Sequence, residues 1–223
     1  MAYRTVKQES EIEQVIKRSR FIGRCFPVTN EQEALALLER IRRQHWDATH
    51  NCYAYSIGEH GACARFSDDG EPSGTAGMPM MEAIRRIGVT DVLVVVTRYF
   101  GGILLGAGGL VRAYASAAAA AIEAAGKLEI HRCAKLTLRV PYALWGRVET
   151  LLRERPQHVQ IASVQYEAEV NASVWAFEEE AAGLIHAVVD RTDGSVRPLI
   201  TAHAMRPFPS PEPAMQEQEK EER

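Results

Sequence analysis

The sequence lacks paired cysteines, long apolar runs and an excess of basic residues. Its four cysteines, Cys25, Cys52, Cys63 and Cys133, are scattered without a CxxC pair, so their spacing supports neither a metal site nor a disulfide framework. The apolar run Val92–Val96 is far too short to span a bilayer, and the first residues form no apolar signal core. We therefore expect a reduced, cytoplasmic protein without membrane contact.

The charge balance excludes the simplest kind of nucleic-acid-binding protein, one that is strongly basic throughout. The formal net charge is -3 at pH 7, and much of the acidic excess lies near the C-terminus. Any site for a polyanion must therefore be a local patch in the first part of the chain. With 223 residues, 46% hydrophobic and 25% charged, the composition is that of an ordinary globular protein with one large or two modest domains.

Hydrophobic periodicity and turn residues predict an α+β domain over residues 1–130. Val92–Val96 is the pattern of a central strand covered on both faces. Helix Leu110–Ala125 is almost all small residues, which allows it to lie very close to a sheet. The other predicted elements are a strand or hairpin within Ser10–Val28, a helix from Thr29 or Asn30 to His45, strands His50–Ile57 and Ala62–Phe66, and a helix with Pro79 in its first turn and Gly88 as its stop.

The pattern restarts after Gly126, and we place the domain boundary within Gly126–Cys133. Residues 131–206 are predicted to form a ferredoxin-like βαββαβ domain. Its predicted elements are strand Ala134–Val140, helix Leu144–Arg155, strand material with a turn in Val159–Val170, a helix spanning Val174–Val188, and strand Val196–Met205. Residues 207–223 are rich in proline and glutamate and are predicted to be a disordered tail.

One polar loop, Arg65–Gly77, concentrates carboxylates, hydroxyls and glycines. Asp68, Asp69 and Glu71 are oxygen ligands that suit Mg²⁺, although their spacing is not that of an EF-hand. Turn formation explains the same acids equally well, because Asp and Ser side chains bond to their own backbone. We expect Ser73 or Thr75 to cap the helix that contains Pro79.

The second segment, Thr97–Arg112, is glycine-rich and joins a buried strand to a helix. Its glycines allow a phosphate to approach backbone N–H groups, although neither the Walker nor the Rossmann pattern fits. The alternative is that small residues permit close packing of helix and strand. Arg98 and Arg112 favour anion contact, and Tyr99 and Phe100 favour stacking on bases. The candidate nucleic-acid or anion site comprises Arg65, Ser73, Thr75, Arg98, Tyr99, Phe100, Gly101, Gly102, Gly106, Gly108, Gly109 and Arg112.

Two further groups have both a chemical and a structural interpretation. His50 and Cys52 share a strand face, which allows a nucleophile pair, but a small buried thiol near a bonded histidine is the more common case. The basic pairs Lys17-Arg18, Arg42-Arg43 and Arg85-Arg86 become relevant only if folding brings them beside Arg98 and Arg112.

These motifs together resemble the YigZ/IMPACT family. The resemblance is carried by Lys17–Ile22, the His50–Ala54 strand, the string Phe66–Met80 and the string Val96–Tyr114. It implies a first domain similar to a small-subunit ribosomal protein and to domain IV of elongation factor G, an α/β sandwich, and a second domain similar to the ferredoxin-like domain V of that factor. It also implies contact with the translation apparatus, since eukaryotic members regulate translation during amino-acid starvation. No catalytic residues carry over.

We therefore expect a non-enzymatic binding protein that contacts RNA, the ribosome or a translation factor, without a cofactor. The alternatives are an enzyme that acts on a phosphorylated metabolite or nucleotide with Mg²⁺ held by Asp68, Asp69 and Glu71, and a pure protein-interaction module. The oligomeric state is left open.

Overall fold

The structure, a computed structural model, describes residues 2–208 and divides into two compact units. The first unit is Tyr3–Leu128, and the second begins at Glu129. Both contain an antiparallel sheet with helices, so the predicted α+β class with two domains is confirmed. None of the helices in this range has the length and apolar character needed to cross a membrane.

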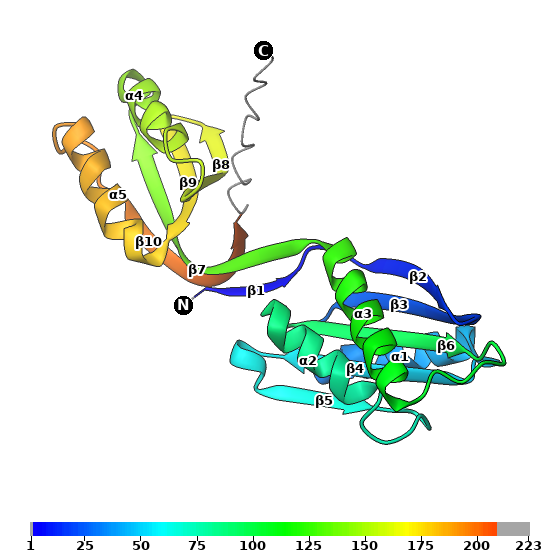
Figure 1. Cartoon of the computed structure of the whole chain (residues 1–223). Coiled ribbons are helices and arrows are strands. Elements are labelled where there is room, and N and C mark those ends of the chain that lie inside the picture. Colours follow the sequence, from blue (N-terminus) through cyan, green and yellow to red (C-terminus); the bar gives the residue numbers. More distant parts are fainter. Residues whose placement is uncertain (1, 209–223) are drawn as a thin grey trace, which may run out of the picture. The chain divides into compact units, whose positions relative to one another are not determined.

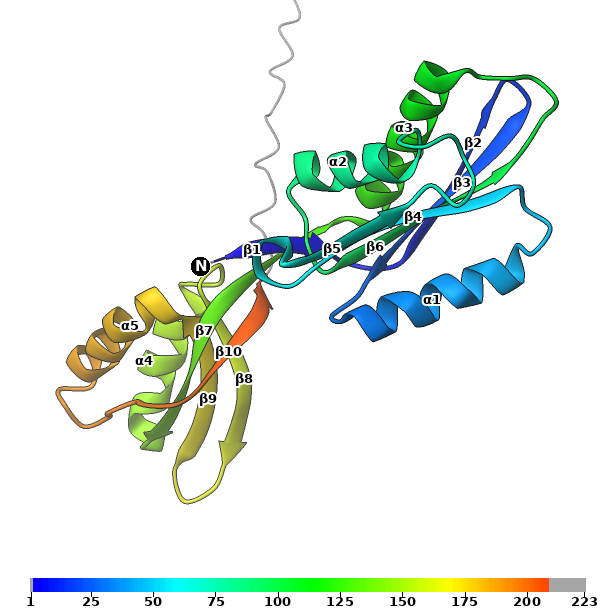
Figure 2. The same ribbon diagram turned by 90° about the horizontal axis from the view of Figure 1, so that it is seen from below.

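The first unit is a five-stranded sheet between two helical layers (Figures 1 and 2). The strand order is β2-β3-β6-β4-β5, and every neighbouring pair is antiparallel. Helices α2 and α3 lie on one face, and α1 lies on the other. The elements are β1 (Tyr3–Val6), β2 (Ser10–Ile16), β3 (Ser19–Pro27), α1 (Glu31–Gln44), β4 (His50–Ile57), the short 3₁₀ helix η1 (Glu59–Gly61), β5 (Cys63–Ser67), α2 (Gly77–Ile87), β6 (Val92–Tyr99) and α3 (Ala107–Ala125).

The central strand β6 is covered on both faces, as its uninterrupted apolar run predicts. Val92, Val94 and Val96 belong to the core shared with α2 and α3. Leu93 and Val95 belong to the core shared with α1. All five are fully buried, which explains why this strand shows no polar alternation.

Helix α3 lies against β3 at very short range, which explains its small residues. A Cβ atom added to Gly23 would lie 2.7 Å from the carbonyl oxygen of Ala117. The alanines of α3 and the glycine of β3 therefore meet backbone to backbone. The prediction that this helix lies close to the sheet is confirmed.

The ends of the helices follow local chemistry, with one difference from prediction. Asn30 caps α1 by accepting a hydrogen bond from Glu33 N, and Gly88 ends α2 in the left-handed conformation. Helix α3 begins at Ala107 rather than Leu110, so Gly108 and Gly109 lie inside its first turn. The irregular segment is therefore shorter than predicted, and within it Gly102 and Gly106 have positive φ angles.

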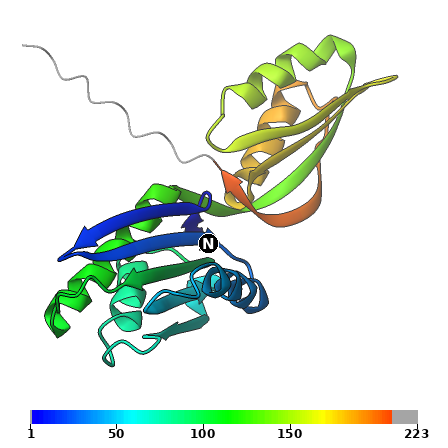
Figure 3. The same ribbon diagram turned by 90° about the vertical axis from the view of Figure 1, so that its right-hand side faces the viewer.

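The second unit has the predicted βαββαβ order, with both helices on one face of the sheet (Figures 1 and 3). Strands β10, β7, β9 and β8 follow one another in the order of a ferredoxin-like unit, in a five-stranded sheet to which β1 also belongs. Its elements are β7 (Lys127–Val140), α4 (Tyr142–Arg153), β8 (Val159–Tyr166), β9 (Val170–Phe177), α5 (Glu178–Arg191) and β10 (Leu199–Phe208).

Two predicted boundaries in this unit are wrong. Val174 and Phe177 lie in β9 and not in a helix, because Val170, Ala172, Val174 and Ala176 alternate into the core. Residues 207 and 208 belong to β10 and not to the tail, and Phe208 is fully buried. The predicted disorder of the rest of the tail, residues 209–223, lies outside the described residues.

Candidate binding site at one end of the first unit

Four connecting segments meet at one end of the sheet in the first unit. They are the β2–β3 turn at Lys17 and Arg18, the segment 45–49 after α1, the loop 68–76 and the segment 100–106. We call this region the loop end (Figures 1 and 2). Thr49 Oγ1 accepts a hydrogen bond from Phe100 N at 3.1 Å, and Ser19 Oγ accepts one from Gly101 N at 3.2 Å. The backbone of the glycine-rich segment is therefore held by hydroxyls from two other segments.

A buried ion pair joins the acidic loop to the glycine-rich segment. Arg98 Nη1 donates to Glu71 Oε1 at 2.6 Å, and Tyr114 Oη donates to the same oxygen at 2.7 Å. The side chains of Arg98 and Glu71 are 6% and 3% exposed, so solvent barely screens their attraction. Arg98 precedes the glycines and Tyr114 follows them, so the two predicted loops do lie beside one another.

Arg98 is enclosed by aromatic rings, and this corrects its predicted role. Its guanidinium carbon lies 5.4 Å from the ring centre of Phe21 and 5.5 Å from that of Phe100. Its Nη2 lies 3.4 Å from Ser19 Oγ, and its Nε is buried and has no hydrogen-bond partner within residues 2–208. A side chain that is buried and already neutralised does not serve as a surface contact for a phosphate. Arg98 instead holds Glu71 of the acidic loop and Ser19 of β3 at the end of β6.

Asp68 holds the start of α2. Its Oδ1 accepts hydrogen bonds from Ala76 N at 3.0 Å and Gly77 N at 2.8 Å, and its Oδ2 accepts one from Gly74 N at 2.8 Å. Burial alone raises the pKa of a carboxyl group, but the three N–H donors outweigh it and lower the pKa of Asp68. The expected cap by Ser73 or Thr75 is therefore wrong. Thr75 Oγ1 donates to the Pro72 carbonyl, and no side chain of either residue caps the helix.

The three carboxylates of the predicted Mg²⁺ site point to different partners. Asp69 Oδ2 accepts from Asn51 N at 2.6 Å, and its Oδ1 lies 3.4 Å from Arg42 Nη2. Asp68 binds backbone N–H groups, and Glu71 binds Arg98 and Tyr114. Within residues 2–208, no three His, Cys, Asp or Glu side chains gather as metal ligands. The arrangement does not support the predicted set of ligands.

His50 and Cys52 bond to the acidic loop rather than to each other. Cys52 Sγ donates to the Asp68 carbonyl at 2.9 Å, and burial raises the pKa of this thiol to about 12. Burial also raises the pKa of Tyr114, with further contributions from Cys52 and Glu71. His50 Nδ1 donates to the Asp69 carbonyl at 2.8 Å. Because the nucleophile is the thiolate, a thiol with so high a pKa supports the structural interpretation of this pair.

The glycines of the segment have separate roles. A Cβ atom on Gly101 would lie 2.1 Å from the carbonyl carbon and oxygen of Arg18, so only glycine allows this crossing of the chains. Gly102 and Gly106 have open space beside them but positive φ angles of 82° and 74°. The close-packing interpretation therefore accounts for Gly101, and the turn geometry accounts for Gly102 and Gly106.

Exposed apolar and basic side chains surround this rigid centre. Trp46 is 83% exposed, Leu104 82%, Phe100 46% and Ile103 40%. Lys17, Arg18 and Arg112 are also exposed. No ion pair involves these three cations in the described part of the chain.

The basic pair Lys17-Arg18 is brought to the site by folding. Lys17 and Arg112 line one pocket of about 320 Å³ with Gly109 and Ser116. Arg18 lies directly beside Gly101. The basic pair Lys17-Arg18 was expected to be relevant only if folding placed it beside Arg98 and Arg112. The shared pocket shows that it does lie beside Arg112. Lys17 and Arg18 both have positive φ angles, of 46° and 65°, which non-glycine residues adopt only at some energetic cost.

Two predicted site residues are engaged elsewhere. Arg65 lies on β5, and its Nε is 2.9 Å from Glu31 Oε1 of α1. Tyr99 Oη donates to Asp47 Oδ1 at 3.1 Å, and the guanidinium of Arg20 lies 5.3 Å from the Tyr99 ring centre. Arg20 therefore occupies one face of the Tyr99 ring, and Arg98 lies over the Phe100 ring. Trp46 is the most accessible aromatic side chain of the loop end, and Phe100 remains partly exposed.

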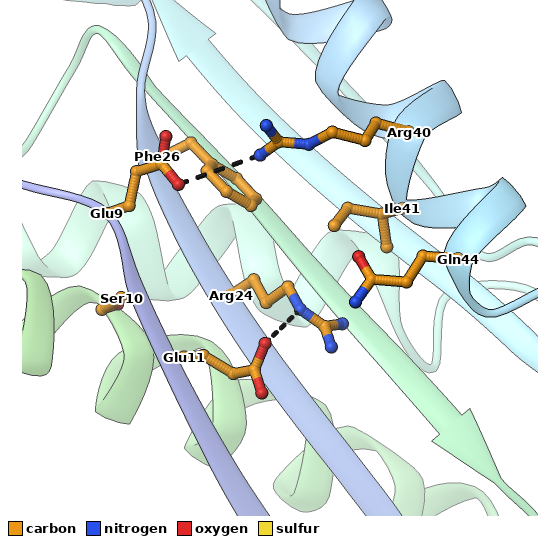
Figure 4. A pocket seen from close by; sticks show the side chains of 8 residues that line it. All are labelled: Glu9, Ser10, Glu11, Arg24, Phe26, Arg40, Ile41 and Gln44. Atoms are coloured by element: carbon orange, nitrogen blue, oxygen red, sulfur yellow. Dashed lines mark hydrogen bonds and ion pairs between the residues drawn. The ribbon is translucent and has the colours of Figure 1, made fainter.

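A second polar network lies on the side of the sheet that carries α1. Arg24 is 4% exposed, and it reaches Glu11 Oε2 at 2.7 Å and His45 Nε2 at 2.6 Å. Figure 4 shows Arg24 and Glu11 pointing toward one another in a pocket of about 310 Å³. Arg40 and Glu9 form a second, looser pair there, at 3.8 Å. The charges of this pocket are balanced internally, in contrast to those of the loop end.

Sequence reasoning missed Trp46 and Arg24 at these sites. Trp46 follows the last turn of α1 and has no periodic pattern to distinguish it. Arg24 lies in β3 between buried neighbours, at a position where a charged residue signals an internal partner. That partner, Glu11, lies opposite it on β2 in the antiparallel register.

Comparison with known proteins places these motifs in a family. The Impact N-terminal domain family matches residues 17–122, and a domain of unknown function, DUF1949, matches residues 138–195. IMPACT family member YvyE of Bacillus subtilis (strain 168) is 40% identical over 193 residues, which cover 86% of this chain and 88% of YvyE. The chain belongs to the IMPACT family.

Other relatives agree with this assignment. IMPACT family member YigZ of Escherichia coli (strain K12) is 40% identical over 139 residues, or 61% of this chain and 68% of YigZ. A solved structure described as that of a hypothetical protein is 32% identical, with a TM-score of 0.58, and covers 90% of this chain and 98% of its own. The resemblance to the YigZ/IMPACT family is therefore confirmed. The residues of the buried Glu71–Arg98 pair lie within the matched IMPACT domain.

Proposed function

We propose that this IMPACT family member is a cytoplasmic binding protein that contacts RNA of the translation apparatus through the loop end. The observation that carries the proposal is the presence of exposed cations without acidic partners beside exposed aromatic rings. Lys17, Arg18 and Arg112 supply the charge, and Trp46 and Phe100 supply the rings. Cations bind phosphates, and rings stack on unpaired bases whatever their identity.

The buried centre explains how such a surface remains rigid. The Glu71–Arg98 pair and the Ser19 and Thr49 hydroxyls fix the backbone on either side of Phe100. A preorganised surface loses less conformational entropy on binding than a flexible one. The same centre weakens the enzyme alternative, since Asp68, Asp69 and Glu71 are all engaged in internal bonds.

Fluorescence anisotropy with labelled single-stranded RNA across a salt series tests the proposal. Each phosphate contact adds about one unit to the slope of log affinity against log salt, so Arg112→Ala should lower that slope by about one. Trp46→Ala should weaken binding by about 1–3 kcal/mol and leave the slope almost unchanged. Arg86→Ala removes an exposed cation of α2 and serves as the control. Absence of RNA binding by the wild type at low salt would contradict the proposal.

A protein partner is the second candidate, and the tip of the glycine-rich segment favours it. Leu104 is 82% exposed and Ile103 is 40% exposed, and neither side chain carries charge or stacks on bases. Burial of these two adjacent side chains against a partner protein would remove their apolar surface from water. If a translation factor is the partner, Leu104→Ser should weaken its capture while leaving the salt dependence of RNA binding unchanged.

A further inference from the structure

The sheet of the second unit has one face that none of the helices within residues 2–208 covers. Helices α4 and α5 cover one side of the sheet (Figure 1). Leu136, Leu138 and Val174 point to that side, because they share a buried core with residues of the two helices. Because successive residues of a strand point to opposite sides, the alternate residues of β7, β8 and β9 form the other face. We call this the open face. It comprises Lys135, Thr137, Arg139, Gln160, Ser163, Gln165, Asn171, Ser173 and Trp175, with Leu199 and Arg206 of β10. At one end, Trp175 packs in an apolar cluster with Cys133, Phe177, Ala204 and Phe208.

A row of hydroxyl groups crosses the open face. Thr137 is paired with Ser173 and Ser173 with Ser163 in the strand register, so their side chains lie side by side. Ser163 and Ser173 hydroxyls are 2.8 Å apart, and Thr137 and Thr201 hydroxyls are 3.3 Å apart. The row of hydroxyls therefore runs across β8, β9, β7 and β10. If an apolar partner covered the centre of this face, the row would be expected to hold Val, Ile or Leu in place of its Ser and Thr residues.

The centre of the open face carries positive charge, and its acids lie at the margins. Strands β8, β9 and β10 contain no Asp or Glu. In β7, Glu129 is on the same face but near the start of the strand, where it lies 3.5 Å from His131. At the β8–β9 turn, Glu167 Oε2 accepts a hydrogen bond from Asn171 Nδ2 at 3.1 Å. Lys135, Arg139 and Arg206 lie on the face, and Arg139 is exposed at its edge. The first turn of α5, by contrast, holds Glu178, Glu179 and Glu180. These acidic side chains lie in the first turn of α5, at the β8–β9 turn and near the start of β7.

One aromatic ring on the open face carries two cations. The guanidinium carbon of Arg206 lies 4.6 Å from the Trp175 ring centre, and Lys135 Nζ lies 6.0 Å from it. The Nε atom of Arg206 is buried and has no hydrogen-bond partner among the described residues. The contact with the Trp175 ring holds the Arg206 guanidinium at the open face.

We propose that the open face binds single-stranded RNA along its sugar–phosphate backbone. Lys, Arg, Ser, Thr and Gln side chains are the usual donors to phosphate oxygens and sugars. The face presents all of them, with the carboxylates of Glu129 and Glu167 only at its margins. The face of an antiparallel sheet is also a known surface for holding single-stranded RNA. Exposed rings for base stacking are scarce here, because Trp175 is covered, so the contact is to the backbone and shows little sequence preference. The ligand class is that of the proposed function, but this surface shares no residue with the loop end.

Binding by matched variants of the full chain tests this inference. The double variant Lys135→Ala/Arg139→Ala should lower the salt slope of RNA binding by about two units. Arg147→Ala removes an exposed cation from α4, on the helical side, and should bind like the wild type. Thr137→Val keeps the β-branched shape but removes a hydroxyl of the row, and it should weaken binding with the slope unchanged. Thermal unfolding of each variant checks that it is folded.

A second measurement needs no variant. RNA that contains 4-thiouridine, cross-linked to the wild-type chain, should modify peptides from β7, β8 or β9. Cross-links confined to the first unit, or a double variant that binds like Arg147→Ala, would overturn the inference while leaving the loop end in place. Loss of binding in the double variant but not in Arg112→Ala would support the open face and count against the loop end.

Discussion

Glu71 and Arg98 form an ion pair of 2.6 Å between two side chains that are almost completely buried. They come from separate segments, 27 positions apart, and the pair joins the acidic loop to the end of the central strand. Charges in such surroundings have lost their hydration, so each depends on the other. The pair therefore controls stability and the shape of the loop end together.

Glu71→Gln should destabilise the protein by about 3–5 kcal/mol, because it leaves the Arg98 charge buried and unpaired. Urea unfolding monitored by circular dichroism measures the change. Glu13→Gln breaks an exposed ion pair with Arg20, at 3.0 Å, and provides the control. Much smaller destabilisation is expected there, since surface pairs are screened by solvent. Equal effects of the two variants would contradict the importance of burial.

Asp68→Asn should destabilise the protein by about 0.5–2 kcal/mol at neutral pH, because a capping carboxylate that accepts three N–H bonds is lost. The pKa of Asp68 is lowered in the folded state, so its contribution is complete above the ordinary value of 3.8 and is lost as the pH falls through the lower folded value. The stability difference between wild type and variant should therefore shrink below about pH 3.8. A difference that grew on acidification would show that the sign is wrong.

Gly101→Ala should destabilise the protein by about 1–3 kcal/mol or more, since its Cβ would lie 2.1 Å from the Arg18 backbone and the chain must move. Gly146→Ala is the matched control, because nothing lies within 4 Å of its Cβ position in α4. That substitution should instead stabilise the helix by about 0.5–1 kcal/mol. Chemical unfolding of both variants distinguishes steric conflict from the general effect of replacing glycine.

Much of the fold could be predicted because local signals and burial agree. The run Val92–Val96 lies in a central strand, Asn30 caps α1, and Gly88 ends α2, each for a reason that is visible in a few consecutive residues. The region around Val174 shows where local sequence cannot decide between a strand and a helix. Apolar residues there fit both a period of two and a helical spacing, and the pairing of β9 with β7 and β8 decides between them.

The candidate site could be located but not described from sequence. The two motif-rich segments do meet, yet the burial of Arg98 depends on Phe21 and Glu71, which are distant in the chain. Likewise, Asp68 caps α2 from eight and nine positions away, beyond the usual N-cap spacing. Composition identifies residues that are suited to ligands, but only the tertiary structure shows which of them are already bonded to the protein itself.

His45 provides a final prediction because its hydrogen bonds determine its protonation. Arg24 can only donate, so His45 Nε2, at 2.6 Å, must accept, and the proton resides on Nδ1, which donates to Tyr99 Oη at 2.9 Å. Burial, and then the nearby Arg24 charge, lower the pKa of His45 from its ordinary value of 6.5.

The unfolded chain therefore takes up a proton at this residue before the folded protein does, and stability should fall as the pH drops below 6.5. An NMR titration should show the His45 ring still neutral at a pH where an exposed histidine is half protonated. Urea unfolding between pH 7.5 and pH 5.5, values chosen to lie about one unit either side of the ordinary pKa, should show a weaker pH dependence for His45→Gln than for the wild type. His186→Gln, which removes an exposed histidine of α5, is the control and should retain the wild-type dependence. If His45→Gln kept the full dependence, the Arg24–His45–Tyr99 chain of hydrogen bonds would not hold the imidazole neutral.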